Sequence, residues 1–183
     1  MPSQRLFTRN FSFLVFGQIS SLFGNYTLKF ALSMYILEKT GSASAFATIL
    51  AVAMLPTILL SPLGGILADR ANRRNIMVVL DVLSGFTVLF AGLALPLGHE
   101  MLVVGILLVV LSVLSAFESP TVQACIPQML SNDNLTKGNA VVNQVQAIAA
   151  LVTPFLGSLI YVAFGLAPVL WGTVVCFFVK ALL

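Results

Sequence analysis

The sequence predicts an all-α membrane protein, a bundle of six transmembrane helices. Three observations lead to this prediction. Hydrophobic residues make up 59% of the 183 residues and charged residues only 8%, whereas soluble domains carry about a quarter charged residues. Long apolar runs recur along the chain, each near the ~20 residues that a helix needs to cross a bilayer. The few basic residues gather in alternate connections between these runs.

Six apolar segments are long enough to be membrane-spanning helices. We expect these helices at 11–37, 43–68, 76–97, 101–126, 138–164 and 167–183. Residues 1–10 form a short segment before the first helix, and residues 11–183 form one transmembrane domain. Because the connections are short, successive helices should run antiparallel.

Lysine and arginine predict the orientation in the membrane. Lys39 is the one basic residue on its side of the predicted bundle. The opposite side carries Arg5, Arg9, Arg70, Arg73, Arg74, Lys137 and Lys180. Because positive residues remain inside, both chain ends should be cytoplasmic. The net charge of +3 reflects this asymmetry and does not indicate nucleic-acid binding.

Polar side chains share one face of the first helix. At about 100° per residue, Gln18, Ser21, Asn25 and Lys29 fall within an arc of about 120°. A charged side chain at the depth of Lys29 should face a bundle interior or water, because lipid exposure costs about 2.5–3.5 kcal/mol. A water-filled cavity is the favoured interpretation. The alternative is that Lys29 snorkels outward while the amides bond to neighbouring helices.

Two acids lie at hydrocarbon depth. Glu118 shares a helix face with Ser115 and precedes Pro120, which should kink the helix. Desolvation favours the protonated form of a buried carboxyl group, so Glu118 could load and release a proton; a permanent ion pair with a cytoplasmic arginine is the alternative. For Asp81, a structural salt bridge to Arg73 or Arg74 is favoured over a proton site.

One face of the fifth helix combines amides with small residues. Asn143 and Gln146 lie toward its cytoplasmic end, and Thr153, Pro154 and Gly157 lie nearer the middle. Small residues let helix backbones approach closely, and proline weakens the helix locally. This face could pack against another helix, line a cavity, or do both.

The turn between the second and third helices concentrates charge beside the membrane. Asp69 opposes the dipole of the helix that it ends, so it needs external donors. Asn72 suits a left-handed turn conformation, and the arginines can bind helix-end carbonyls, carboxylates or lipid phosphates. We therefore expect a gating latch as well as a topology signal. Its residues are Gly65, Asp69, Arg70, Asn72, Arg73 and Arg74.

The stretch Gly65-x-x-x-Asp69-Arg70-x-Asn72-Arg73-Arg74 resembles the loop signature of the major facilitator superfamily, and its place between the second and third helices fits that family. Within the family, the chain resembles bacterial drug exporters of the macrolide-efflux type. The segments that carry this narrower resemblance are Phe16-Gly17-Gln18-x-x-Ser21, Glu38-Lys39-Thr40-Gly41-Ser42, Pro120-Thr121-x-x-Ala124-x-Ile126-Pro127 and Leu135-Thr136-Lys137-Gly138-Asn139.

The resemblance implies the N-terminal half of a twelve-helix transporter, built from two inverted three-helix repeats and lacking its C-terminal half. It implies proton-coupled efflux of amphiphilic drugs across the bacterial inner membrane by alternating access. Asp69 would contact a helix of the C-terminal half, and Arg73 a carboxylate of this half. The implied partners are a small-molecule substrate, protons, the lipid bilayer and the C-terminal half.

The sequence departs from the family at three places. Asn72 replaces a glycine of the loop signature, and Thr153-Pro154-x-x-Gly157 only weakly matches an antiporter signature of the fifth helix. Leu111 stands where some relatives have an arginine linked to proton coupling. That departure moves the proposed proton role to Glu118 and Lys29.

Two other functions remain open. The same bundle could be a non-transporting membrane scaffold, or an importer of small solutes from the same superfamily. An enzyme is not expected, because the sequence has no nucleophile–base pair, no metal-ligand spacing and no phosphate-binding loop beside a strand. For the same reasons we expect neither a cofactor nor a metal, and no nucleic-acid partner.

Overall fold

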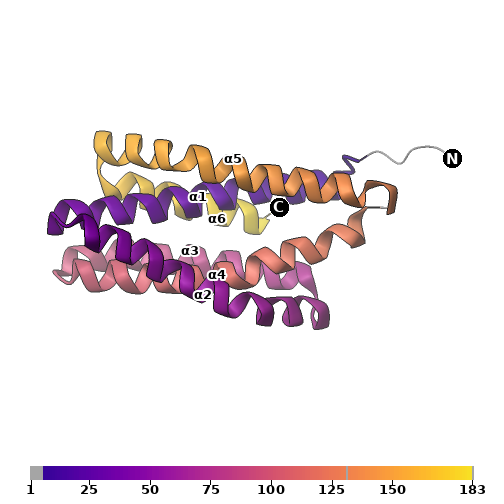
Figure 1. Cartoon of the computed structure of the whole chain (residues 1–183), viewed down its shortest axis with the longest axis horizontal. Coiled ribbons are helices and arrows are strands. Elements are labelled where there is room, and N and C mark those ends of the chain that lie inside the picture. Colours follow the sequence, from indigo (N-terminus) through magenta and orange to yellow (C-terminus); the bar gives the residue numbers. More distant parts are fainter. Residues whose placement is uncertain (1–5, 131, 183) are drawn as a thin grey trace.

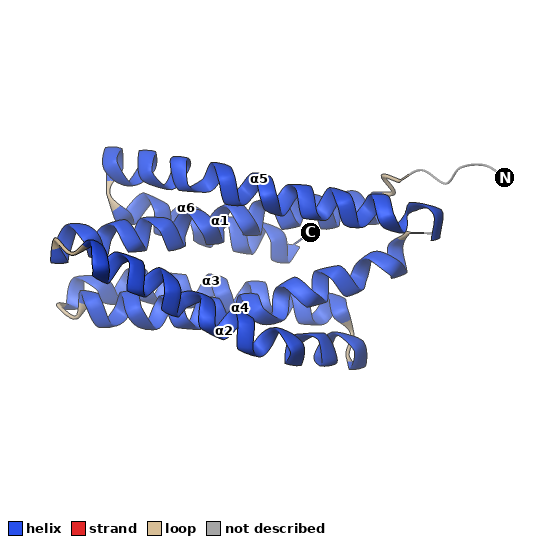
Figure 2. Cartoon of the chain, in the orientation of Figure 1, coloured by secondary structure: helices blue, strands red, loops and turns tan. Residues whose placement is uncertain are grey.

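The computed structural model describes residues 6–130 and 132–182, and this part of the chain consists of helices joined by short turns, without a strand (Figures 1 and 2). Residues 1–5 with Arg5, residue 131 and the expected helix end at 183 lie outside the described residues. The helices are α1 (Arg9–Thr40), α2 (Ala43–Arg70), α3 (Arg73–Ala94), α4 (Glu100–Met129), α5 (Asn132–Phe164) and α6 (Leu166–Leu182), with a short 3-10 helix η1 (Leu95–Leu97) after α3.

The helices begin earlier or end later than the apolar runs that indicate them. The largest difference is in α5, which begins at Asn132 rather than at residue 138, because a helix continues into polar sequence beyond the hydrocarbon. By length and composition α2, α4, α5 and α3 with η1 can cross a membrane, and α6 is a shorter apolar helix. The polar stripe of α1 makes it the least apolar of the six.

Local chemistry defines the helix ends. The side chains of Thr8, Ser42 and Asn72 accept hydrogen bonds from the first turns of α1, α2 and α3, which satisfies amide groups that lack intrahelical partners. Gly41 and Gly165 adopt left-handed φ angles of 64° and 79° directly after α1 and α5. Glycine tolerates this conformation without a steric penalty.

The helices pack as two groups of three. In one group α1 packs on α5 and α6, and in the other α4 packs on α2 and α3; the two groups lie one above the other in Figure 1. Exchanging α1–α3 for α4–α6 maps one group onto the other and maps the α3–α6 contact onto itself. Because successive helices alternate in direction, α1 and α4 are oppositely oriented. This contact pattern is that of two inverted three-helix repeats.

Glycines allow the closest helix contacts. A Cβ atom on Gly64 of α2 would lie 2.7 Å from the carbonyl oxygen of Ala116 in α4. A Cβ atom on Gly157 of α5 would lie 3.0 Å from the carbonyl oxygen of Thr27 in α1. These two contacts occupy corresponding helix pairs, so each repeat contributes one close approach.

Two apolar cores enclose a polar layer. One core includes Leu28, Leu32 and Leu108, and the other includes Phe11 and Ile126. Between them along the helices lie buried polar side chains of α1, α3, α4 and α5: Gln18, Ser21, Asn25, Asp81, Ser84, Ser112, Glu118, Thr121 and Thr153. This layer contains the candidate site.

Candidate functional site

A cavity of about 570 Å³ opens into the polar layer between α1, α2, α4 and α5. Its apolar wall comes mainly from α2, with residues such as Met54 and Ile58. Its polar wall comes from Gln18, Asn25, Lys29, Ser115, Glu118, Gln146 and Thr153. We call this space the central cavity. Apolar walls with a few convergent polar groups are typical of small-molecule sites.

Three buried polar atoms at the central cavity have no hydrogen-bond partner in the described part of the chain. They are Oε1 of Gln18, Oδ1 of Asn25 and Oγ1 of Thr153. Each of these side chains is at most 5% exposed. Leaving a buried polar group unpaired costs about 1–3 kcal/mol, so these atoms are available to a ligand or to water.

Lys29 supplies a cation to the same cavity. Its Nζ lies 3.5 Å from Oγ of Ser115, at the long limit of a hydrogen bond. Among the described residues no carboxylate lies within ion-pair distance of Lys29. The ammonium therefore faces the cavity with a hydroxyl group as its protein partner.

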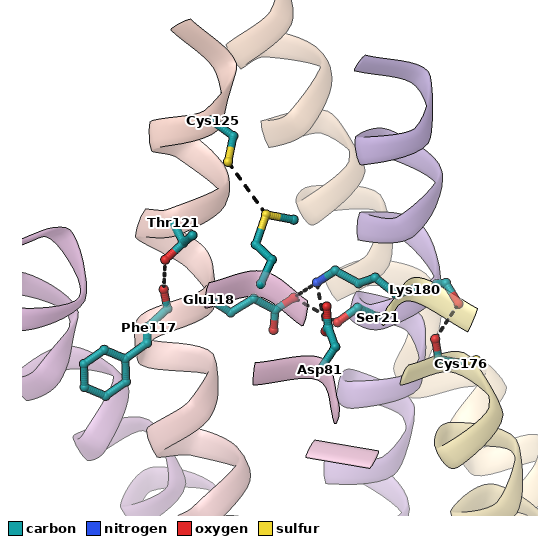
Figure 3. Close-up of polar contacts among 10 residues, drawn as sticks. Ser21, Asp81, Phe117, Glu118, Thr121, Cys125, Cys176 and Lys180 are labelled. Atoms are coloured by element: carbon teal, nitrogen blue, oxygen red, sulfur yellow. Dashed lines mark hydrogen bonds and ion pairs between the residues drawn. The ribbon is translucent and has the colours of Figure 1, made fainter. Parts of the chain in front are cut away.

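A buried ion cluster adjoins the central cavity. Nζ of Lys180 on α6 pairs with Oε1 of Glu118 on α4 and lies 3.1 Å from Oδ1 of Asp81 on α3 (Figure 3). Ser21 of α1 donates a hydrogen bond of 2.9 Å to the same Glu118 oxygen. The exposed fractions of Asp81, Glu118 and Lys180 are 1%, 7% and 6%. Four helices therefore meet at one charged group, which we call the lysine cluster.

The prediction that Asp81 pairs with Arg73 or Arg74 is wrong. Asp81 pairs with Lys180, whereas Nε of Arg73 donates to the carbonyl oxygen of Ala68 at 2.9 Å and its Nη2 lies 3.6 Å from Asp69. The reason is helix geometry: eight residues along α3 advance about 12 Å, so Asp81 lies beyond the reach of the arginines at the start of that helix. The alternative proposed for Glu118, an ion pair with an arginine, is also corrected, because its cation is Lys180.

Asn72, in the turn between α2 and α3, does not have the left-handed conformation expected from the sequence. Its φ angle is −69°, so it is not left-handed. Instead Oδ1 of Asn72 accepts hydrogen bonds from the backbone amides of Arg74 and Asn75 at 3.1 and 3.5 Å. An N-cap needs extended backbone and a short polar side chain, which asparagine provides as well as the left-handed conformation.

The turn presents an acid to its surroundings. The side chain of Asp69 is 76% exposed, and that of Arg73 is 19% exposed because it folds back over the end of α2. Arg70 and Arg74 are exposed, and a Cβ atom on Gly65 would meet nothing within 4 Å. Exposed charge and an open glycine leave this face free to contact another surface.

The remaining candidates separate into three sets. Gln18, Asn25, Lys29, Ser115 and Gln146 line the central cavity as expected from their helix faces. Ser21 belongs to the lysine cluster, and Asn143 is exposed outside the cavity lining. Thr153 and Pro154, expected in helix packing, line the cavity, whereas Gly157 packs against Thr27.

Sequence reasoning missed Lys180 as a member of the site. The residue follows a long apolar run, where a lysine ordinarily snorkels to the membrane surface, so the sequence alone assigns it only to the orientation signal. Its side chain is 3% exposed and points inward. The missed signal was the presence of two acids at hydrocarbon depth, which together require a buried cation.

Comparison with known proteins places this geometry in context. A family model described as Major Facilitator Superfamily matches residues 14–183. Macrolide efflux protein A of Streptococcus pyogenes is 31% identical over 150 residues, which cover 79% of this chain and 36% of that protein. The uncharacterized MFS-type transporter YvqJ of Bacillus subtilis is 27% identical over 157 residues, covering 82% and 36%. The chain thus spans about a third of the length of these curated relatives.

A solved structure has the same fold. The crystal structure of a bacterial homologue of the iron transporter ferroportin, in its outward-facing state, superposes with a TM-score of 0.68 at 19% identity. The match covers 96% of this chain and 47% of that chain. The described bundle therefore corresponds to about half of a larger helical fold.

Proposed function

Because the chain belongs to the Major Facilitator Superfamily and is a multi-pass bacterial membrane protein, we propose that it forms the N-terminal half of a secondary transporter that exports amphiphilic small molecules in exchange for protons. The printed names of the relatives refer to macrolide efflux. Macrolides are accordingly the first substrates to test.

The central cavity is the observation that carries this proposal. It combines the apolar wall of α2 with three unpaired buried polar atoms and the ammonium of Lys29. An amphiphilic molecule can cover the apolar wall and satisfy the polar atoms together. A scaffold protein has no need of a cavity whose buried polar atoms are available to a bound molecule.

In an alternating-access mechanism, the charged turn between α2 and α3 would act as an inner gate. We expect the end of the bundle that carries Arg9, Arg70, Arg73 and Arg74 to face the cytoplasm, because positive residues remain inside. There Asp69 is exposed and available to a helix of the C-terminal half. Such contacts would close the inner side in one state and release as the halves rock.

Proton coupling is assigned to Glu118 and Asp81. Both carboxyl groups are buried at hydrocarbon depth, and Glu118 borders the central cavity. Acidic groups inside transmembrane helices are expensive and commonly mark proton relays. A proton bound here would change the charge beside the substrate, which couples the two binding events.

The test uses inverted membrane vesicles containing the intact transporter and a radiolabelled macrolide. We expect respiration-driven accumulation inside the vesicles, abolished by a protonophore and reduced at least tenfold in Glu118→Gln. Glu100→Gln, which alters an exposed acid at the other end of α4, is the matched control and should accumulate macrolide normally. Accumulation that ignores the protonophore, or that occurs only in right-side-out vesicles, would contradict the proposal.

A further inference from the structure

We propose, on the basis of the proton-coupled transport proposed above, that Lys180 is a proton-relay residue between Glu118 and Asp81. In this proposal the lysine cluster connects the central cavity to a second cavity at the Arg-rich end of the bundle. Protons would then cross this domain by a route separate from the turn between α2 and α3. Neither membership of the family nor the names of the relatives assigns a role to Lys180.

The first supporting observation is a wall shared by two cavities. Glu118 lines the central cavity. Asp81 and Lys180 line a second cavity of about 420 Å³, together with Arg9 and Arg74. Glu118 and Asp81 contact the same Nζ atom of Lys180 (Figure 3). The lysine cluster therefore has one member on the central cavity and two members on the second cavity.

The second observation is the charge of the cluster. One ammonium and two carboxylates carry a net charge of −1, and the cluster lies in an interior where isolated charge is strongly disfavoured. One added proton makes it neutral. Because Lys180 contacts both acids, the proton can reside on Glu118 while Lys180 pairs with Asp81, or on Asp81 while Lys180 pairs with Glu118. These two states are the two ends of a relay.

The transfer of a proton from Glu118 to Asp81 through Lys180 breaks and forms equal numbers of bonds. An N–H bond of the Lys180 ammonium breaks, and its proton forms an O–H bond at Asp81. The amine lone pair of Lys180 then takes the proton of the Glu118 carboxylic acid, whose O–H electrons remain on Glu118. The lysine ends as it began, and the net change is one proton moved from Glu118 to Asp81.

The two acids of the relay have different surroundings. At the central cavity, Lys29 and Tyr26 of α1 share the lining with Glu118, and Ser21 of α1 donates a hydrogen bond to Glu118. The lining of the second cavity also includes Arg9 of α1 and Arg74 of α3, with Cys125 of α4 as a further titratable group. The linings contributed by α2 and α5 to the central cavity carry no charge. A proton that leaves Asp81 therefore enters the second cavity, at the Arg-rich end of the bundle.

Packing holds Lys180 in this position. A Cβ atom on Gly17 would lie 3.1 Å from Cγ of Lys180, so the lysine stem runs directly over the α1 backbone. Its side chain is 3% exposed, which excludes snorkelling to the membrane surface in this conformation. The ammonium is therefore oriented inward by the fold.

The decisive variant is Lys180→Arg in the intact transporter, reconstituted in proteoliposomes. Arginine keeps the positive charge and can pair with both acids, but a guanidinium does not give up its proton in proteins. A relay role therefore predicts at least a tenfold loss of gradient-driven macrolide uptake and of macrolide-induced proton flux, followed with a trapped pH-sensitive dye. Counterflow exchange of labelled for unlabelled macrolide, which needs no net proton movement, should persist.

Asp81→Asn is the second variant, and we expect the same pattern: lost coupling with retained counterflow. Glu100→Gln is the control for a change of acid outside the route. If Lys180→Arg remains coupled, Lys180 is only a counter-ion and the relay is overturned. If both variants also lose counterflow, the cluster is structural and the relay is likewise overturned.

The outcome also separates this inference from the proposed function. Coupling that is lost in Glu118→Gln but retained in Asp81→Asn and Lys180→Arg would overturn the relay and leave proton-coupled efflux standing. A wild-type transporter whose macrolide uptake is indifferent to the proton gradient would overturn both.

Discussion

Two lysine–glutamate pairs lie at different depths of the bundle. Lys180 and Glu118 pair inside the polar layer, each less than a tenth exposed, with Asp81 as a second acid. Lys39 and Glu100 pair at 2.9 Å at the opposite end, with side chains 48% and 38% exposed. Tyr35 also donates a hydrogen bond to Glu100. The chemistry of the two pairs is the same, and their surroundings differ.

The difference shows how burial changes what an ion pair does. Water screens the exposed pair, so either residue can be lost at little cost. The buried pair has given up its hydration, and the loss of one partner leaves an uncompensated charge. A buried ion pair therefore contributes little net stability to the fold. Its position between two cavities gives it a functional reason to persist.

The largest expected effect is on stability when the buried pair is broken. Lys180→Met leaves Asp81 and Glu118 without a cation and should destabilise the protein by about 3–5 kcal/mol. The triple variant Lys180→Met, Asp81→Asn, Glu118→Gln removes every charge of the cluster and should recover most of this loss. Thermal unfolding of the intact protein in detergent measures both. A triple variant no more stable than the single one would refute the uncompensated-charge explanation.

A pair of adjacent glycines makes a similar comparison without charge, because Gly64 packs against α4 and Gly65 does not. Gly64→Ala places a Cβ atom 2.7 Å from the Ala116 carbonyl oxygen and should destabilise by about 1–3 kcal/mol. Gly65→Ala meets nothing within 4 Å, and alanine favours the helix by about 1 kcal/mol. Melting temperatures of the two variants should therefore shift in opposite directions. Equal shifts would mean that helix propensity, not contact with α4, dominates at both positions.

Lys29 lies between the two extremes, because it is partly buried and has a hydroxyl partner instead of an acid. Lys29→Met should leave the melting temperature unchanged or raise it, since it removes a charge that no described carboxylate balances. Macrolide affinity, measured by equilibrium binding, should fall about tenfold if the ammonium contacts substrate. A fall in stability with unchanged affinity would place Lys29 among structural residues.

The smallest effect is expected at the exposed pair. Lys39→Met removes a solvated ion pair and a cation stacked on the Tyr35 ring at 5.4 Å. We expect no measurable change in melting temperature and unchanged macrolide efflux in cells. A loss comparable to that of Lys180→Met would show that burial does not distinguish the two pairs.

Composition and spacing predict the fold well. The apolar runs indicate all six α-helices, because the runs are long and separated by short polar turns, although among the described residues length and composition alone mark only α2 to α5 as able to cross a membrane. Periodicity in α1 also brings Gln18, Asn25 and Lys29 to one cavity, since a regular helix fixes which side chains share a face. These are properties of single helices, which a sequence encodes locally.

Features that depend on contacts between helices were not predictable from the sequence. Asp81 could be paired correctly only with knowledge that α3 packs on α6. Asn143 lies on the polar face of α5, which the sequence suggests could line a cavity. In the folded bundle, the orientation of α5 leaves Asn143 exposed. Asn72 illustrates a local ambiguity, because asparagine serves both as an N-cap and in left-handed turns.

The position of Lys180 on α6 has a consequence for biosynthesis. Helices enter the bilayer in chain order as the ribosome delivers them, so Asp81 and Glu118 arrive before the lysine that neutralises them. Until α6 follows, the two acids lack the cation that contacts both of them in the folded bundle. The lysine cluster is therefore complete only once α6 is in place.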